Sequence, residues 1–269
     1  MPRTRADTSS SKSDSVKQGE KVIIDVGWSN LAVVDASKTR KAAAPGGIHL
    51  AQNLGTLGGT GLTAYFGLIK VGEAKPDDVV VVSGAAGATG SMVVQIAKHI
   101  VGCKKVIGIA GSKEKCDWVK SLGADECLDY KSPSFEEDFN KVTPDFANLY
   151  FDNVGGTILD YALTRLARYG RVVACGAISG YDSHADQRVG LKNWSQIITM
   201  RLQVRGFIVI DYLSEAAQAL GVIGKGIQEG KIQVEGNQHI VETEFDDIPK
   251  TWLGLYSGKN TRKVITALK

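Results

Sequence analysis

The stretch Val79-Val-Val-Val-Ser-Gly-Ala-Ala-Gly-Ala-Thr-Gly90 decides the fold of this 269-residue chain. Its four consecutive valines predict a short strand buried on both faces, as in a parallel sheet. The glycines that follow turn the chain sharply into the apolar helical pattern of residues 91–101. A strand, a glycine turn and a helix N-terminus can bind a diphosphate, because free N–H groups and the helix dipole both favour negative charge. The glycine pattern alone is weak support, since any tight turn favours glycine.

Downstream of this loop, strand patterns alternate with helix patterns. Further strands are predicted at residues 105–110, 126–130, 149–151, 171–175 and 204–210, and helices at 113–122, 135–141, 158–166, 194–200 and 214–229. The alternation indicates an α/β fold with a doubly wound parallel sheet, whose ligand binds beyond the carboxyl ends of the strands.

The segments outside this alternation predict a few smaller features. Near the N-terminus, apolar runs at 22–24 and 31–34 are joined by a turn at 27–30, which predicts a hairpin. Residues 54–68 are dense in glycine, which predicts close packing against a ligand or another backbone, or equally a helix start with packing glycines. Late strands at 238–242 and 264–267 flank a helix around 248–255.

Bulk composition excludes several classes of function. Acids and bases are interspersed and the net charge is +3, so neither nucleic acid nor an anionic membrane is an expected partner. No apolar run reaches the length of a membrane span, and the N-terminus lacks the apolar region of a signal peptide. The cysteines at 103, 116, 127 and 175 form no C-x-x-C pair, so they indicate neither a zinc site nor a disulfide framework. We therefore expect a cytoplasmic protein without metal.

The end of the second predicted strand indicates which dinucleotide would bind. In NAD-preferring sites this strand usually ends in Asp or Glu, which bonds the ribose hydroxyls of the adenosine. Here it ends Ile109-Ala-Gly-Ser112, and Lys113 and Lys115 follow directly. Two lysines at a helix start are also typical of a solvated surface. Together with the missing acid they favour a 2′-phosphate, and therefore NADPH.

Five motifs are specific in combination. They are Leu54-Gly-Thr-Leu-Gly-Gly-Thr-Gly-Leu-Thr-Ala-Tyr-Phe-Gly-Leu68, Ser83-Gly-Ala-Ala-Gly-Ala-Thr-Gly90, Ala110-Gly-Ser112, Tyr150-Phe-Asp-Asn-Val-Gly-Gly156 and Cys175-Gly-Ala-Ile-Ser179. The chain from about Glu20 to Lys269 thereby resembles the zinc-free branch of the medium-chain dehydrogenase/reductase family. The nearest group contains prostaglandin reductases, leukotriene B4 12-hydroxydehydrogenase and double-bond reductases. The resemblance implies hydride transfer from NADPH to the β-carbon of an α,β-unsaturated ketone or aldehyde, without metal.

Carried over residue by residue, the resemblance also implies a cofactor site. Its residues are Gly87, Ala88, Thr89, Gly90, Ser112, Lys115, Tyr130, Asn153, Cys175, Gly176, Ala177, Ile178, Phe207, Ile208, Val209 and Asn260. Residues 87–90 would bind the pyrophosphate, and Lys115 and Tyr130 the 2′-phosphate. Asn153 would line the cleft, and Asn260 would be a late contact. Residues 175–181 match the segment along the nicotinamide.

Tyr181 is the implied catalytic residue. It falls where the family has a tyrosine near the nicotinamide ribose and the substrate carbonyl; without the resemblance, an aromatic residue that caps a loop would be the plainer interpretation. Hydride addition to an enone leaves an enolate, so the site needs a donor where negative charge develops on oxygen. The tyrosine hydroxyl could be that donor, and the tyrosine or a water could give the final proton.

The chain departs from the family at its N-terminus. Family members begin with a substantial substrate domain, whereas only about fifty residues precede Leu54 here. We therefore expect a disordered arm at 1–18, a remnant of the GroES-like substrate domain at 19–53, a Rossmann domain at 54–235, and a segment at 236–269 that returns to the remnant. Gly59-Thr60 also stands where relatives carry bulkier residues over the nicotinamide. Both changes open the site.

Three functions remain open at this stage. The first is an NADPH-dependent double-bond reductase, completed as a homodimer through the strand at 204–210. The second is a reductase-like protein used as a non-redox isomerase or cyclase on a biosynthetic intermediate. The third is a non-catalytic NADPH-binding subunit. A gene prediction that lost its first exons would also explain the short N-terminal part.

Overall fold

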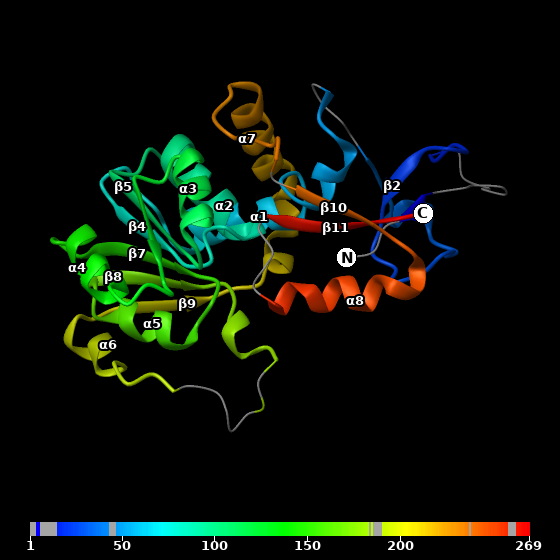
Figure 1. Ribbon diagram of the computed structural model, residues 1–269. Helices are drawn as coiled ribbons and strands as arrows, with labels where there is room; N and C mark the ends of the chain where they lie inside the picture. Colours follow the sequence, from blue (N-terminus) through cyan, green and yellow to red (C-terminus); the bar gives the residue numbers. More distant parts are fainter. Residues whose placement is uncertain are drawn as a thin grey trace.

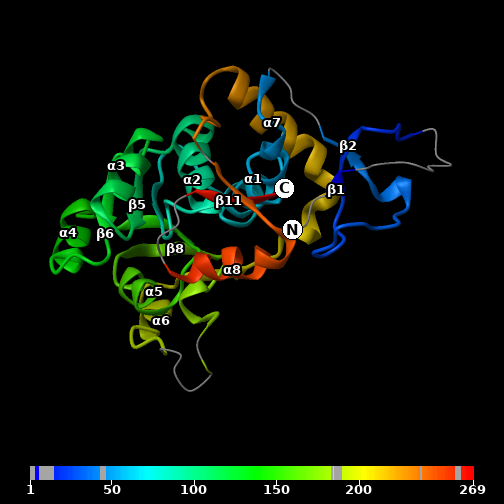
Figure 2. The same ribbon diagram turned by 45° about the vertical axis from the view of Figure 1, so that its right-hand side comes forward.

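The computed structural model describes residues 4–5, 15–42, 47–182, 184, 190–236, 238–257 and 262–269. A parallel sheet with helices on both faces forms its larger part, and two small groups of strands lie to one side of it (Figure 1). The turned view shows the same division, with the strand β11 (Lys263–Leu268) leading to the C-terminus of the chain (Figure 2).

The large sheet confirms the predicted doubly wound fold. Its six parallel strands lie in the order β6 (Glu126–Asp129), β5 (Lys105–Ala110), β4 (Val79–Val82), β7 (Ala147–Asp152), β8 (Leu166–Ala174) and β9 (Gln203–Gly206). The chain winds outward from β4 in one direction and then, from β7, in the other. The loops after β4 and β7 therefore meet at the point where the order reverses, which is where open α/β sheets bind ligands.

The core consists of two apolar layers, one on each face of this sheet. Val80 and Val82 of β4 face α1 (Gly59–Phe66), α2 (Ala88–Gln95) and α3 (Lys113–Ser121). Val81, one residue along the strand, faces α4 (Phe135–Val142), α5 (Gly156–Leu163) and α6 (Ser195–Thr199). All three valines are completely or almost completely buried. The run of four valines thus predicts this environment correctly, because alternate strand residues point to opposite faces.

Several predicted elements have different ends in the structure. The helix predicted at 158–166 ends at Leu163, and β8 begins at Leu166, because the buried Leu166 pairs with Ala147 of β7. Gly170 therefore lies inside a strand rather than at the end of a helix. The strand predicted at 204–210 ends at Gly206, and a 3₁₀ helix covers Val209–Glu215 before α7 (Ala216–Gln228).

The predicted N-terminal hairpin is wrong. Strand β2 (Lys21–Ile23) lies between β1 (Thr4–Arg5) and β3 (Arg40–Lys41), and it pairs antiparallel with both. Residues 31–34 form no strand, and the side chains of Leu31 and Val33 are 86% and 106% exposed. The apolar run at 31–34 suggested a strand, but it has no buried face against which to pack.

The C-terminal segment returns to the glycine loop. Strands β10 (Gln238–Thr243) and β11 pair in parallel, and α8 (Ile248–Leu253) lies between them in the chain. Just before β11, the backbone N–H of Arg262 donates to Ala86 O at 2.9 Å, and Arg262 forms a bridge with Gly87. Arg262 and the glycine loop, which are far apart in the sequence, thus lie side by side beyond the end of β4.

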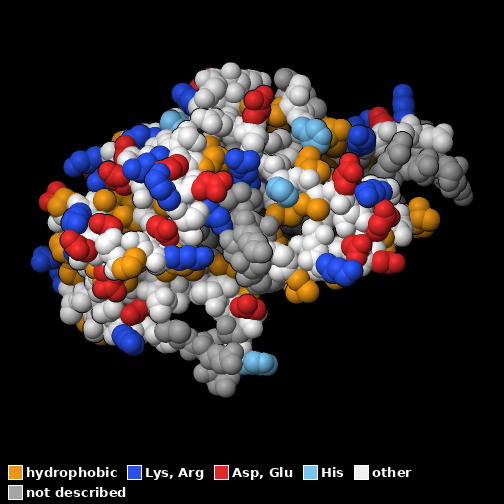
Figure 3. Space-filling model, viewed as in Figure 1, with side chains coloured by type: hydrophobic (Ala, Val, Ile, Leu, Met, Phe, Trp, Pro, Cys, Tyr) orange, Lys and Arg blue, Asp and Glu red, His pale blue; other side chains and the backbone are white. Residues whose placement is uncertain are grey.

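The distribution of charge on the surface and the character of the helices are as the amino-acid composition predicts (Figure 3). Lys, Arg, Asp and Glu side chains are intermixed on the face shown in Figure 3. Within the described residues, no helix has the length and apolar character needed to cross a membrane.

Candidate functional site

The loop after β4 leaves the N-terminus of α2 open at the carboxyl end of the sheet. Gly84 has a left-handed backbone (φ 58°), and Gly87 occupies the position before the first helical residue. A Cβ on Gly90 would overlap the carbonyl oxygen of Gly84 and lie 2.8 Å from the Cα of Ala85. Glycine at this position therefore allows the helix to approach the turn closely. Gly87, Ala88 and Thr89 remain half-buried. The Gly87 N–H donates to Gly84 O at 2.9 Å, so ligand oxygens can reach the N–H groups of Ala88 and Thr89.

The loop after β7 is tied to the glycine loop by hydrogen bonds. The Ser83 hydroxyl donates to Asp152 Oδ1 at 2.8 Å and accepts the backbone N–H of Asn153 at 2.8 Å. The Asn153 side-chain amide donates to Ser83 O at 2.7 Å, and Asp152 also accepts the N–H groups of Val154 and Gly155. Asp152 is 2% exposed, and this burial raises the pKa of its carboxyl. Asn153 thus lies at the junction of the two loops.

Ser83 and Asp152 hold this junction together, although neither is among the site residues predicted from the sequence. The role of Asp152 could have been predicted from the local sequence, because an Asp followed by glycines often accepts the backbone N–H groups two and three residues later.

Ser112, Lys115 and Tyr130 come together beyond β5 and β6, and we call these three residues the phosphate subsite. The Ser112 hydroxyl accepts the backbone N–H of Lys115 at 3.2 Å and so caps α3. The Tyr130 N–H donates to Ala110 O at 3.0 Å, and the Tyr130 ring lies against Gly111, where a Cβ would be 2.8 Å from Tyr130 Cε1. Burial lowers the pKa of the Lys115 ammonium, and the charge of Lys131 lowers it further.

The segment predicted to lie along the nicotinamide is bound to the β7 loop through its backbone. The N–H groups of Cys175 and Gly176 donate to Asp152 O at 2.9 and 3.0 Å. Burial, helped by the charge of Asp152, raises the pKa of the Cys175 thiol to about 12. The thiol therefore stays protonated at neutral pH and has little nucleophilic character.

Tyr181 closes this segment at its far end. Its hydroxyl oxygen accepts the Ala177 N–H at 3.1 Å, while the side chain remains 61% exposed. The oxygen is thus fixed by the loop, and the hydroxyl proton is left for another acceptor. This geometry is compatible both with a loop cap and with a donor to a substrate oxygen.

The structure does not bring every predicted residue to the cleft. The Phe207 side chain packs into the core, where a Cβ on Gly67 would collide with its ring, and it also contacts Tyr212 at 6.4 Å between ring centroids. Ile208 is exposed and Val209 begins the 3₁₀ helix, so these positions follow the end of β9. Asn260 lies outside the described residues.

Two glycines of residues 54–68, Gly58 and Gly61, pack against the chain's own backbone. A Cβ on Gly58 would overlap the carbonyl of Asn53, and one on Gly61 would overlap the carbonyl of Thr56. At these two positions, glycine allows a tight turn before α1 and is not needed for a ligand. Packing against the chain's own backbone therefore explains both glycines without a ligand.

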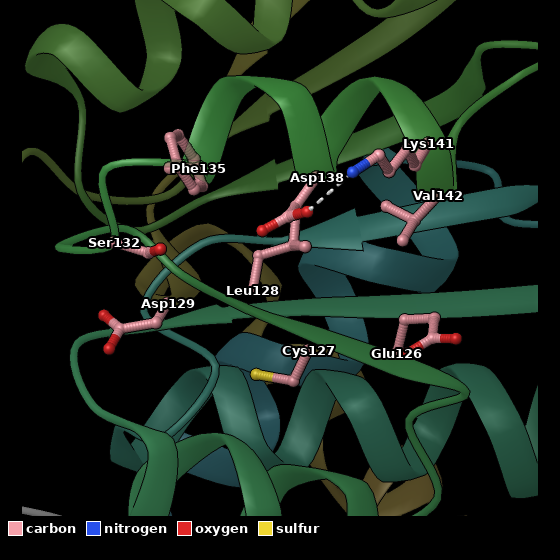
Figure 4. Close-up of a pocket in the computed structure, with 9 residues that line it drawn as sticks. All are labelled: Glu126, Cys127, Leu128, Asp129, Ser132, Phe135, Asp138, Lys141 and Val142. Atoms are coloured by element: carbon pink, nitrogen blue, oxygen red, sulfur yellow. Dashed lines mark ion pairs between the residues drawn. The ribbon is translucent and has the colours of Figure 1, made fainter.

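Two surface hollows lie near the phosphate subsite. The first, of about 330 Å³, runs along the edge strand β6 beneath α4 and collects charged groups, including the pair Asp138 and Lys141 at 3.6 Å (Figure 4). None of the predicted cofactor residues lines it. The second has a similar volume and lies between Tyr130 and α5, with Pro133 and Tyr161 in its wall. Within the described residues, no three His, Cys, Asp or Glu side chains are grouped as metal ligands would be.

Comparisons with known proteins agree with this geometry. The sequence model of the family described as "Zinc-binding dehydrogenase" matches residues 88–224. Prostaglandin reductase 1 of Bos taurus is 40% identical over 259 residues, which cover 95% of this chain and 77% of that protein. The 2-alkenal reductase (NADP(+)-dependent) of Nicotiana tabacum is 36% identical, over 93% of this chain and 71% of that protein. The crystal structure of CurA in complex with NADPH from Vibrio vulnificus superposes with a TM-score of 0.84 at 34% identity, covering 93% of this chain and 74% of that one.

Proposed function

Since the chain belongs to the medium-chain dehydrogenase/reductase family, in the branch that contains the prostaglandin reductases, we propose that it reduces the conjugated C=C bond of α,β-unsaturated ketones or aldehydes with NADPH. The observation that carries this proposal is the arrangement at the switch point of the sheet. The cationic phosphate subsite after β5 and β6, the open helix N-terminus after β4 and the Tyr181 loop after β8 follow one another in this order along the carboxyl ends of the strands.

The residues present fit a dinucleotide with a 2′-phosphate. The close approach permitted by Gly90 leaves room and free N–H groups for the diphosphate at the start of α2. Lys115 supplies positive charge beside Tyr130, where an NAD-preferring site would carry an acid. Asn153 and the backbone of residues 175–178 would line the nicotinamide half. When bound, NADPH supplies the hydride.

Tyr181 is the residue that we assign to the developing charge on the substrate. Reduction of the double bond places negative charge on the carbonyl oxygen, and a fixed hydroxyl donor there lowers the barrier without reorganising. The bond from the Ala177 N–H fixes the Tyr181 oxygen and polarises its O–H toward a further acceptor. The same hydroxyl, or a water beside it, then returns a proton to the substrate.

A homodimer is part of the proposal. Strand β9 is the edge of the large sheet, and Val204 in it is 47% exposed. An edge with exposed apolar side chains and free backbone groups pairs readily with a second copy.

The proposal is tested by titrating the purified chain with NADPH and following its oxidation with a panel of small and bulky enones. Tyr181→Phe should lower turnover by roughly 10²-fold, as loss of one hydroxyl donor to a developing oxyanion does, while NADPH affinity stays within about twofold. Unchanged turnover would remove Tyr181 from the mechanism. NADPH binding without oxidation by any enone would favour the non-redox isomerase or cyclase, or the binding subunit. Absence of NADPH binding would overturn the cofactor assignment.

A further inference from the structure

Lys131 lies at the edge of the phosphate subsite, and the function proposed above gives it no role. Its ammonium is 5.8 Å from the centroid of the Tyr130 ring. That ring in turn lies against Gly111, next to the Ser112 hydroxyl that caps the helix carrying Lys115. Lys131 and Lys115 therefore approach the same small surface from two different elements, the loop after β6 and the first turn of α3.

The charges around this surface are unbalanced. Lys113 and Lys120 of α3 are paired with Asp117 and Glu126. Among the residues described by the structure, Lys131 forms no ion pair, and the nearby Asp129 carboxylate accepts the backbone N–H of Lys131 at 3.0 Å. The charge of Lys131 acts unfavourably on the Lys115 ammonium, so the two side chains lie close enough to repel each other. Two cations held within reach of each other in this way favour an anion bound beside both.

We propose that Lys131 is a specificity-determining residue, whose ammonium binds the 2′-phosphate of the dinucleotide together with Lys115; this inference rests on the proposed function. A 2′-phosphate carries close to two negative charges at neutral pH, so one lysine leaves it half-neutralised. The second ammonium completes the neutralisation. The contact of Lys131 with the Tyr130 ring keeps its flexible side chain on the correct side of the subsite. Ligands without this phosphate gain nothing from Lys131.

The test measures binding directly and does not depend on turnover. Adenosine 2′,5′-bisphosphate and 5′-AMP are titrated by calorimetry into the full chain and into Lys131→Gln, which keeps the length of the side chain but not its charge. Lys120→Gln is the matched control, because Lys120 lies on the same helix as Lys115 but near its far end, where it is paired with Glu126. We expect Lys131→Gln to weaken the bisphosphate roughly 5- to 20-fold, the range for one partly exposed charged hydrogen bond. Its effect on 5′-AMP should stay below about twofold, as should the effect of Lys120→Gln on both ligands.

A second readout is the ratio of NADPH to NADH affinity, followed by nicotinamide fluorescence. Lys131→Gln should lower this ratio by the same factor, and added salt should shrink the difference between the wild type and the variant. If Lys131→Gln binds the bisphosphate as tightly as the wild type, or if Lys120→Gln weakens it equally, the role of Lys131 is overturned while the proposed function stands. If the wild type binds neither NADPH nor the bisphosphate, the proposed function fails first and this inference fails with it.

Discussion

Replacement of Gly90 by alanine would test whether close packing in the glycine loop makes the site. The added Cβ would lie 2.8 Å from Ala85 Cα and overlap the Gly84 carbonyl, whereas ordinary contact begins at 3.4 Å. The start of α2 must therefore move away from the turn by about 0.6 Å or more. Overpacking of this kind costs about 1–3 kcal/mol, and the better helix propensity of alanine offsets up to ~1 kcal/mol of it. We expect a net loss of about 1–2 kcal/mol in the free energy of unfolding, or roughly 2–8 °C in Tm.

The same movement should weaken NADPH binding more than it weakens the fold. It displaces N–H groups that would bond the diphosphate, and loss of one charge-assisted hydrogen bond is worth about 1.5–3 kcal/mol, or roughly 10- to 150-fold in Kd. Gly221→Ala is the control, because Gly221 lies in α7 with nothing within 4 Å of an added Cβ. It should raise stability by about 0.4–1 kcal/mol and leave the Kd unchanged. Thermal unfolding and fluorescence titration measure both quantities. Wild-type Tm and Kd in Gly90→Ala would refute the packing argument.

Two further predictions concern the supports of the site. Arg171→Ala should lower the free energy of unfolding by about 3–5 kcal/mol, because it leaves the buried Asp78 carboxylate, 2.5 Å from Arg171 Nη2, without this ion pair. Denaturant titration measures the loss. As a control, removal of the exposed Lys113–Asp117 pair should cost at most ~1 kcal/mol in the same titration. The Cys175 thiol titrates near 9.0 when unfolded and at about 12 when folded, so its contribution to stability is complete below pH 9 and is lost as the pH rises toward 12. Cys175→Ala should therefore flatten the alkaline fall in stability, and a profile as steep as that of the wild type would contradict the assignment.

Local sequence patterns predict the centre of the fold well. The valines of β4 require burial on both faces, and only a central strand covered by helices on both sides provides it. The glycine turn and the alternation after it then follow from short-range chemistry. The ends of elements are less predictable, because distant contacts decide them. Leu166 joins a strand since it pairs with Ala147, and Phe207 leaves β9 since its ring fills the space above Gly67.

The positions of the predicted site residues also depend partly on local sequence and partly on contacts between distant segments. Residues that follow strand ends, such as Ser112 and Asn153, lie beyond the sheet wherever the strands lie, so their placement follows from topology alone. The approach of Tyr130 to Gly111 depends on the pairing of β5 with β6, which no local pattern specifies. A residue such as Lys131, one position beyond Tyr130, has no sequence pattern of its own and can be recognised only once its neighbours are placed.

The bridge between Arg262 and the glycine loop explains why the site must be considered with the C-terminal segment. Arg262 has a left-handed backbone (φ 71°), which is unfavourable for a side chain with a Cβ. The conformation is retained because its N–H bonds to Ala86 O and its guanidinium lies 5.1 Å from the centroid of the Trp118 ring on α3. These contacts join β11 to both the diphosphate loop and the helix of the phosphate subsite. A change that loosens β10 and β11 should therefore weaken dinucleotide binding, although neither strand carries a predicted cofactor residue.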